Sequence, residues 1–114
     1  MSPAPTSVLA NSHAARHYYS VAIRTFRDKV AAAAFMGLPV RDIPADLRRR
    51  ARAKLEQIHH AATLQDLRVP PANHLERMQG NRSGQYSIRI NDPWRVCFSW
   101  RDGDAFDVEI VDYH

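Results

Sequence analysis

The fold is decided by the stretch from Gly80 to His114, which reads GNRSGQYSIRINDPWRVCFSWRDGDAFDVEIVDYH. Apolar and polar side chains alternate along it with a period of two, the pattern of strands that bury one face. The residues expected to face inward on three successive strands are Tyr86, Ile88 and Ile90, then Trp94, Val96, Phe98 and Trp100, then Phe106, Val108 and Ile110. We therefore expect an antiparallel meander whose apolar face needs a cover.

Two turns separate these strands. Asn91-Asp92-Pro93 supplies turn-forming residues after the first strand, and Asp102-Gly103-Asp104 tolerates the positive φ angles of a tight hairpin. The polar face of the meander then presents Arg89 and Arg95. These cations are candidates for phosphate contacts, and their alternative role is to pair with Asp107 or Glu109 on a neighbouring strand.

Two helices precede the meander. Asp28 is placed to cap a helix from Lys29 to Met36, which Gly37 and Pro39 end. A second helix starts at Pro44 and carries an apolar stripe at helical spacing. The members of the stripe are Leu47, Ala51, Leu55, Ile58 and Ala62.

The remaining segments are less regular. Val21 to Phe26 alternates well enough to predict a first strand that pairs with the meander and widens the sheet. Residues 1–20, rich in Ser, Ala and Pro, are expected to form a loosely ordered extension. Thr63 to Leu75 contains Pro70-Pro71 and is expected to be a connector. His59-His60 is expected to be a cation pair at the C-terminus of the second helix rather than a metal site.

Length and composition limit what kind of protein this can be. With 114 residues, 45% of them hydrophobic, the chain is expected to form one domain with one core. Cys97 is the only cysteine, so no disulfide can form within the chain, and a cytoplasmic setting is favoured. The sequence has no apolar run near the ~18 residues of a membrane span and no signal-peptide pattern, so we expect no membrane partner.

The positive charge lies in the first half of the chain. Residues 1–60 hold ten of the 16 Lys and Arg but only four of the 12 Asp and Glu. The densest run lies on the second predicted helix and comprises Arg48, Arg49, Arg50, Arg52 and Lys54. A polyanion such as RNA, or an acidic protein, would fit this charge, and the plainer interpretation is a solvated helix face.

Four groups of residues resemble one known family. They are Ile23 to Phe26 (IRTF), Leu75 to Ile88 (LERMQGNRSGQYSI), Trp94 to Phe98 (WRVCF) and Val108 to His114 (VEIVDYH). Together they resemble the HigB branch of the RelE-type toxins, also called plasmid maintenance system killer proteins. The resemblance covers a toxin domain at residues 21–114 and leaves residues 1–20 outside it.

The resemblance implies a fold, an activity and partners. The implied fold is α+β, the RelE-like compact microbial RNase fold, in which two helices pack on one face of a small antiparallel-rich sheet in the order β-α-α-β-β-β. The implied activity is cleavage of messenger RNA in the ribosomal A site without a metal or other cofactor. The implied partners are the ribosome, A-site messenger RNA and a co-encoded HigA-like helix-turn-helix antitoxin, which alone would contact operator DNA.

Metal-free cleavage of RNA needs an acid, a base and cations. His114 is the best acid or base, since an imidazole titrates near roughly 6.5, and Asp112 beside it can orient it. Tyr113 can stack on a base or donate a proton, and Arg95 can stabilise phosphate charge. The resemblance carries these four residues over as catalytic. The side chains expected to contact RNA are Arg89, Arg82, Arg77 and His74.

Three positions depart from the family pattern. Many members carry basic residues at the positions of His74 and Gln79, and the third departure is at Glu76. Some members have a histidine before the glycine that corresponds to Gly80, and the alignment places Glu76 there. Glu76 is therefore the candidate replacement for that histidine. Two other functions stay open: a non-catalytic module that acts through the antitoxin and operator DNA, and a metal-dependent or free ribonuclease that uses the scattered histidines.

Overall fold

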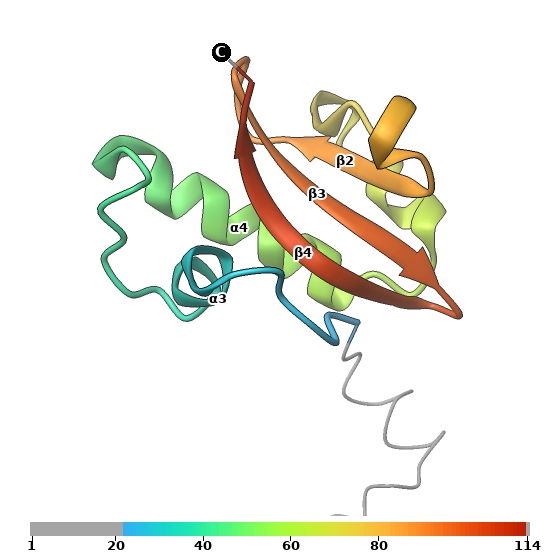
Figure 1. Cartoon of the computed structure of the whole chain (residues 1–114), viewed down its shortest axis with the longest axis horizontal. Coiled ribbons are helices and arrows are strands. Elements are labelled where there is room, and N and C mark those ends of the chain that lie inside the picture. Colours follow the sequence, from blue (N-terminus) through green and yellow to red (C-terminus); the bar gives the residue numbers. More distant parts are fainter. Residues whose placement is uncertain (1–21, 114) are drawn as a thin grey trace, which may run out of the picture.

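The computed structural model describes residues 22–113, so the predicted extension at residues 1–20 and the candidate His114 lie outside the described residues. Two helices, α3 (Lys29–Phe35) and α4 (Arg48–His60), pack on one face of a four-stranded antiparallel sheet (Figure 1). The α+β class and the placement of both helices on one face are as predicted.

The sheet has the strand order β1-β2-β3-β4. Its three long strands, β2 (Gln85–Arg89), β3 (Trp94–Arg101) and β4 (Asp104–Asp112), form the predicted meander. A further strand, β1 (Glu76–Arg77), pairs antiparallel with β2. The sequence did not predict β1, because two residues are too few to show an alternation.

A bulge interrupts β4. Ser99 of β3 pairs with Phe106 and Cys97 pairs with Glu109, so two residues of β4 stand opposite Phe98 alone. Asp107 takes up the extra length with a φ of 53°. Aspartate tolerates this left-handed conformation better than most residues do. The prediction that Phe106 faces inward was therefore wrong: Ala105 is fully buried in its place.

The segment from Ala22 to Arg27 runs parallel to β4 but is not a regular strand. It makes two isolated bridges, Ile23 with Ala105 and Phe26 with Val108. The Thr25 hydroxyl accepts a hydrogen bond from the Asp107 N–H at 2.8 Å, which holds the bulge. The predicted first strand is thus an extended edge segment, because the bulge breaks the continuous ladder that a strand would need.

Both helices begin and end for local reasons. The Asp28 carboxylate caps α3 by accepting from the Ala31 N–H at 3.0 Å, and Gly37, with a φ of 80°, ends it. A 3-10 turn, η1 (Ala45–Leu47), leads from Pro44 into α4. The stripe on α4 is buried as predicted except for its last member: the helix stops at His60, so Ala61 is buried and Ala62 is exposed.

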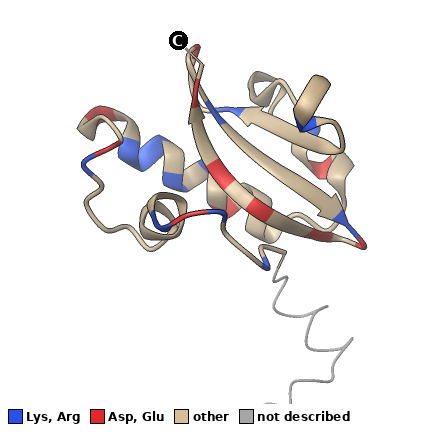
Figure 2. Ribbon diagram, in the orientation of Figure 1, with Lys and Arg blue, Asp and Glu red and all other residues tan. Residues whose placement is uncertain are grey.

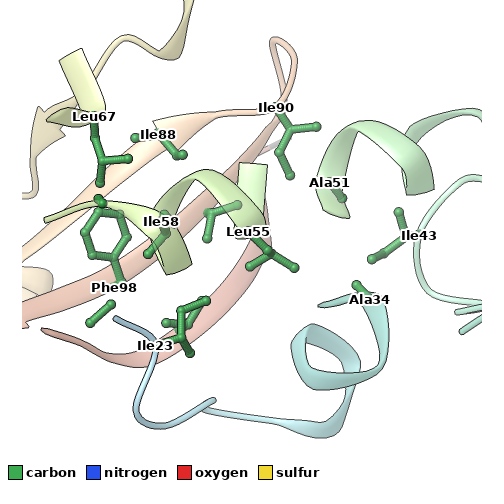
Figure 3. Close-up of a cluster of buried hydrophobic side chains, with 14 of the residues drawn as sticks. Ile23, Ala34, Ile43, Ala51, Leu55, Ile58, Leu67, Ile88, Ile90 and Phe98 are labelled. Atoms are coloured by element: carbon green, nitrogen blue, oxygen red, sulfur yellow. The ribbon is translucent and has the colours of Figure 1, made fainter. Parts of the chain in front are cut away.

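The core lies between the helices and the sheet. Leu55 and Ile58 of α4 are fully buried against Ile88 and Phe98 of the sheet (Figure 3). Burying each such side chain contributes about 1.5–3 kcal/mol. Within residues 22–113 no helix is long and apolar enough to cross a membrane.

His59 is not the helix-end cation that the sequence predicted. Its Nδ1 accepts a hydrogen bond from the Ile23 N–H at 3.4 Å, and its ring packs edge-on against Phe35. Burial lowers the pKa of His59 below 6.5, and His60 lowers it further while Glu56 opposes the shift. A neutral ring is required because a protonated Nδ1 cannot accept.

The connector after α4 is more ordered than predicted. It forms two 3-10 turns, η2 (Leu64–Arg68) and η3 (Pro71–Asn73). The fully buried Asn73 ties them to α4: its amide donates to Gln57 Oε1 at 2.9 Å and its carbonyl accepts from Lys54 Nζ at 2.6 Å. These bonds fix the residues that lead into β1.

Candidate active site

The face of the sheet away from the helices carries a row of polar side chains. Strand register places Glu76 beside Ser87, Ser87 beside Cys97, and Cys97 beside Glu109. Paired residues on neighbouring strands share a face of the sheet. Ser87 and Cys97 are fully buried although they lie on the side without helices. We call this side the polar face.

Arg95 of β3 crosses the polar face and binds three segments. Its Nε donates to Ser87 Oγ at 2.8 Å, its Nη2 donates to the His74 carbonyl oxygen at 2.6 Å, and Glu76 Oε1 lies 3.8 Å from Nη2. Only 12% of the Arg95 side chain is exposed, against 61% of Glu76. The guanidinium is therefore held in one orientation next to an accessible carboxylate.

The position of the His74 carbonyl follows from the connector. His74 follows η3 in a left-handed conformation, with a φ of 45°, which turns the chain toward β1. The preceding Asn73 is anchored to α4, so the carbonyl that receives Arg95 is supported from the core. The His74 side chain itself is exposed, and its backbone rather than its imidazole belongs to the site.

Tyr113 covers the end of the polar face next to β3. Its N–H donates to the Pro93 carbonyl at 2.6 Å, and its hydroxyl lies 3.5 Å from Cys97 Sγ. Desolvation and the contact with Cys97 raise the pKa of Tyr113 to about 12, although Arg82 and Arg95 partly offset this. At neutral pH the phenol is protonated, so it can donate a proton or hydrogen bond but cannot act as a base.

Arg82 reaches the polar face from the turn η4 (Gly80–Arg82), which stands over the sheet on the side opposite α4 (Figure 1). Its Nη1 donates to Glu109 Oε2 at 2.9 Å and to Gln85 Oε1 at 3.0 Å. The hydrogen bond to Glu109 is the main cause that raises the pKa of Arg82. Two guanidinium groups thus lie within electrostatic range of the Tyr113 hydroxyl.

The structure gathers some of the predicted site residues and separates others. Arg82, Arg95, Tyr113 and Glu76 lie on the polar face. Asp112 pairs with Trp94, so it projects toward the helix side, away from Tyr113. His114 lies outside the described residues.

The other predicted RNA contacts lie at the margins of this site. Arg89 pairs with Arg95 in the strand register but forms an ion pair with the exposed Asp92. Arg77 lies opposite Tyr86 with its guanidinium 5.9 Å from the ring, on the same face as the core residue Phe98. Of the four predicted RNA contacts, Arg82 is the one held among the catalytic candidates.

Sequence reasoning gave three residues of the site no functional role. Ser87 accepts a hydrogen bond from Arg95, Glu109 accepts one from Arg82, and Cys97 contacts Tyr113. The signal for Ser87 and Cys97 was their place among the polar-face positions of the alternating strands. Glu109 gave the same signal, since it lies between Val108 and Ile110, which were expected to face inward. Among residues 22–113 no three His, Cys, Asp or Glu side chains are close enough together to hold a metal ion.

Comparison with known proteins identifies the family. Residues 24–114 match the family model described as the RelE-like toxin of the type II toxin-antitoxin system HigB. The chain belongs to the HigB-like toxins. This confirms the resemblance seen in the GQYSI, WRVCF and DYH motifs.

Two curated relatives agree with the family match. The HigB-like toxin described here is 40% identical over 65 residues to Toxin HigB-1 of Vibrio cholerae, an alignment that covers 57% of this chain and 68% of the relative. It is 30% identical over 78 residues to Endoribonuclease HigB of Proteus vulgaris, covering 68% of this chain and 78% of the relative.

Solved structures agree with the fold. The HigB-like chain is similar to the YoeB-YefM complex of Staphylococcus aureus, with a TM-score of 0.52 and 17% identity, covering 82% of this chain and 97% of the other. It is also similar to the YoeB dimer of the same organism, with a TM-score of 0.50 and 18% identity, covering 83% and 98%. At these identities the likeness shows the fold.

Proposed function

We propose that this HigB-like toxin is an endoribonuclease that cuts messenger RNA in the ribosomal A site without a metal and so inhibits translation. The observation that carries the proposal is that Arg82 and Arg95 lie on the same face of the sheet as the protonated hydroxyl of Tyr113, and both cations act on the pKa of Tyr113. Cations on the same face as a hydrogen-bond donor are what a phosphate needs as its charge increases in the transition state. The relative named Endoribonuclease HigB supports the same chemistry.

Each group has a proposed role. Arg95 stabilises the phosphorane, Tyr113 donates to it or stacks on a base, and Glu76, exposed beside Arg95, takes the proton of the 2′-hydroxyl. His114 follows Tyr113 in the sequence and serves as the acid for the leaving oxygen. Asp112 projects from the opposite face, and its proposed role is to orient His114.

The ribosome is the proposed docking partner. Lys and Arg gather on α4, away from the polar face, while Asp and Glu follow β4 (Figure 2). A basic helix on the opposite side of the sheet from the nuclease site fits docking on ribosomal RNA, where binding releases counterions and weakens with salt. The toxin domain would span residues 21–114 and act in the cytoplasm. A helix-turn-helix antitoxin would neutralise it and alone contact operator DNA, as the YoeB-YefM complex suggests for the partner.

The test is cleavage of a programmed messenger RNA by the purified protein, with and without ribosomes and with a chelator present. Cuts that require ribosomes and survive the chelator support the proposal. Arg95→Ala should abolish them, while Arg101→Ala, a change at the opposite end of β3, should not. Cleavage of naked RNA, or loss of cleavage on chelation, would favour a different nuclease. No cleavage by the intact protein would favour the non-catalytic module. The observation that favours this module is that Glu76 stands where some family members have a histidine.

A further inference from the structure

Glu109 is an acidic residue in the middle of a face proposed to bind RNA. It lies opposite Cys97 in the sheet register, and only 15% of its side chain is exposed. A bare carboxylate there would repel a phosphate across a medium of reduced dielectric. Its presence therefore calls for a physical explanation beyond surface solubility.

Two arginines from separate segments neutralise this carboxylate. Arg82 Nη1 lies 2.9 Å from Glu109 Oε2, and Arg27 Nε lies 3.7 Å from Oε1. Arg27 is brought there by the edge segment, since its N–H donates to the Val108 carbonyl at 2.9 Å. Two cations around one anion leave the group with a net positive charge.

The contact also restricts how Arg82 is oriented. Glu109 and Gln85 both accept from Nη1. Neither Nε nor Nη2 of Arg82 donates to another residue in the 22–113 region. The guanidinium is thus fixed through Nη1. Its other edge, formed by Nε and Nη2, keeps the two parallel donors that suit a phosphate.

We propose that Glu109 is a positioning residue that holds Arg82 on the Tyr113 side of the polar face, with the free edge of its guanidinium directed at the RNA phosphate. The inference rests on the proposed nuclease function and adds to it the residue that orients the second cation. Glu109 does not touch RNA; it acts through Arg82, and Arg27 offsets its charge.

The test is a double-mutant cycle on ribosome-dependent cleavage, with kcat and KM measured separately. Glu109→Ala should lower kcat by roughly tenfold or more with KM within about twofold, because the lost orientation affects the transition state more than docking. Glu109→Gln keeps a neutral acceptor for Nη1 and should retain more activity than Glu109→Ala. In an Arg82→Ala background, Glu109→Ala should change kcat by less than about twofold.

Controls separate positioning from stability. Glu56→Ala removes a carboxylate that also pairs with an arginine, Arg52 on α4, and should leave kcat unchanged. Thermal unfolding of every variant shows whether it is folded at the assay temperature. If Glu109→Ala is unfolded there, Glu109→Gln is used for the test instead. Equal losses from Glu109→Ala with and without Arg82 would overturn the positioning role alone. An intact protein that never cuts RNA would overturn both the inference and the proposed function.

Discussion

The guanidinium of Arg95 donates to the backbone carbonyl of His74, which lies at the end of a connector that Asn73 fastens to α4. A cation on the polar face is thereby positioned by contacts that originate in the helix layer on the other side of the sheet. The same contact brings β1 and its Glu76 next to Arg95. The contact between Arg95 and the His74 carbonyl therefore links the fold to the site. Substitutions at Arg95 and at Asn73 should have different, measurable effects.

Replacing Arg95 with lysine should lower cleavage by about two orders of magnitude while the fold is kept. Lysine retains the charge, but its single nitrogen cannot occupy the positions of both Nε and Nη2, which donate to Ser87 and His74. Single-turnover cleavage on programmed ribosomes measures the loss, and circular dichroism checks the fold. Full activity in Arg95→Lys would show that charge alone suffices and that the fixed geometry has no part in catalysis.

The phenol of Tyr113 should titrate about two pH units above an ordinary tyrosine. Its pKa is raised to about 12, so the folded protein binds a proton that the unfolded chain releases from pH 10 upward. The stability contributed by this group is complete below pH 10 and decreases as the pH rises toward 12. Subtracting the phenolate absorbance of Tyr113→Phe from that of the intact protein isolates this one group. A midpoint near 10 would mean that the hydroxyl is not desolvated against Cys97.

Acidification should destabilise the protein through His59. The pKa of His59 is lowered by burial, so below about 6.5 the unfolded chain binds a proton that the folded state resists. The free energy of unfolding should therefore fall as the pH drops through this range. Denaturant unfolding at pH 7.5 and 5.5 measures the change. His59→Gln should reduce it most, and His60→Gln, which removes only the smaller of the two effects that lower the pKa of His59, should reduce it less. Identical pH dependence in all three proteins would exclude His59 as the cause.

Substituting Asn73 with alanine should cost about 2–3 kcal/mol of unfolding free energy. The change leaves the buried Leu67 carbonyl without its donor and Lys54 without its acceptor, and such unmet groups carry costs of this size. Urea denaturation measures it, with the exposed Asn81→Ala as the matched control. The change should also lower cleavage, since the His74 carbonyl would lose its support. A loss below about 0.5 kcal/mol would show that solvent replaces these bonds readily.

Much of this architecture could be predicted because its signals are periodic. The predictions for the alternation along β2 and β3 and for the apolar stripe on α4 were correct because many residues in each element follow the same pattern of burial. Predictions failed where one residue decided the outcome: the bulge at Asp107 turned Phe106 outward, and the end of α4 at His60 exposed Ala62. The site followed the same rule. Arg82, Arg95 and Tyr113 were named from motifs, whereas Glu109 as the partner of Arg82 depends on a turn and a strand that meet only in three dimensions.

The bulge in β4 also decides which residue of the C-terminal motif meets the arginines. Had β4 continued its pairing without a break from Ser99 and Phe106, Cys97 would stand opposite Val108, and every later side chain would change sides. Asp112 would then project toward Arg95, and Tyr113 would turn to the helices. The hydroxyl of Thr25, on the edge segment, stabilises the bulged form through Asp107. Thr25, near the beginning of the fold, thus helps to decide on which face of the sheet Asp112 and Tyr113 lie.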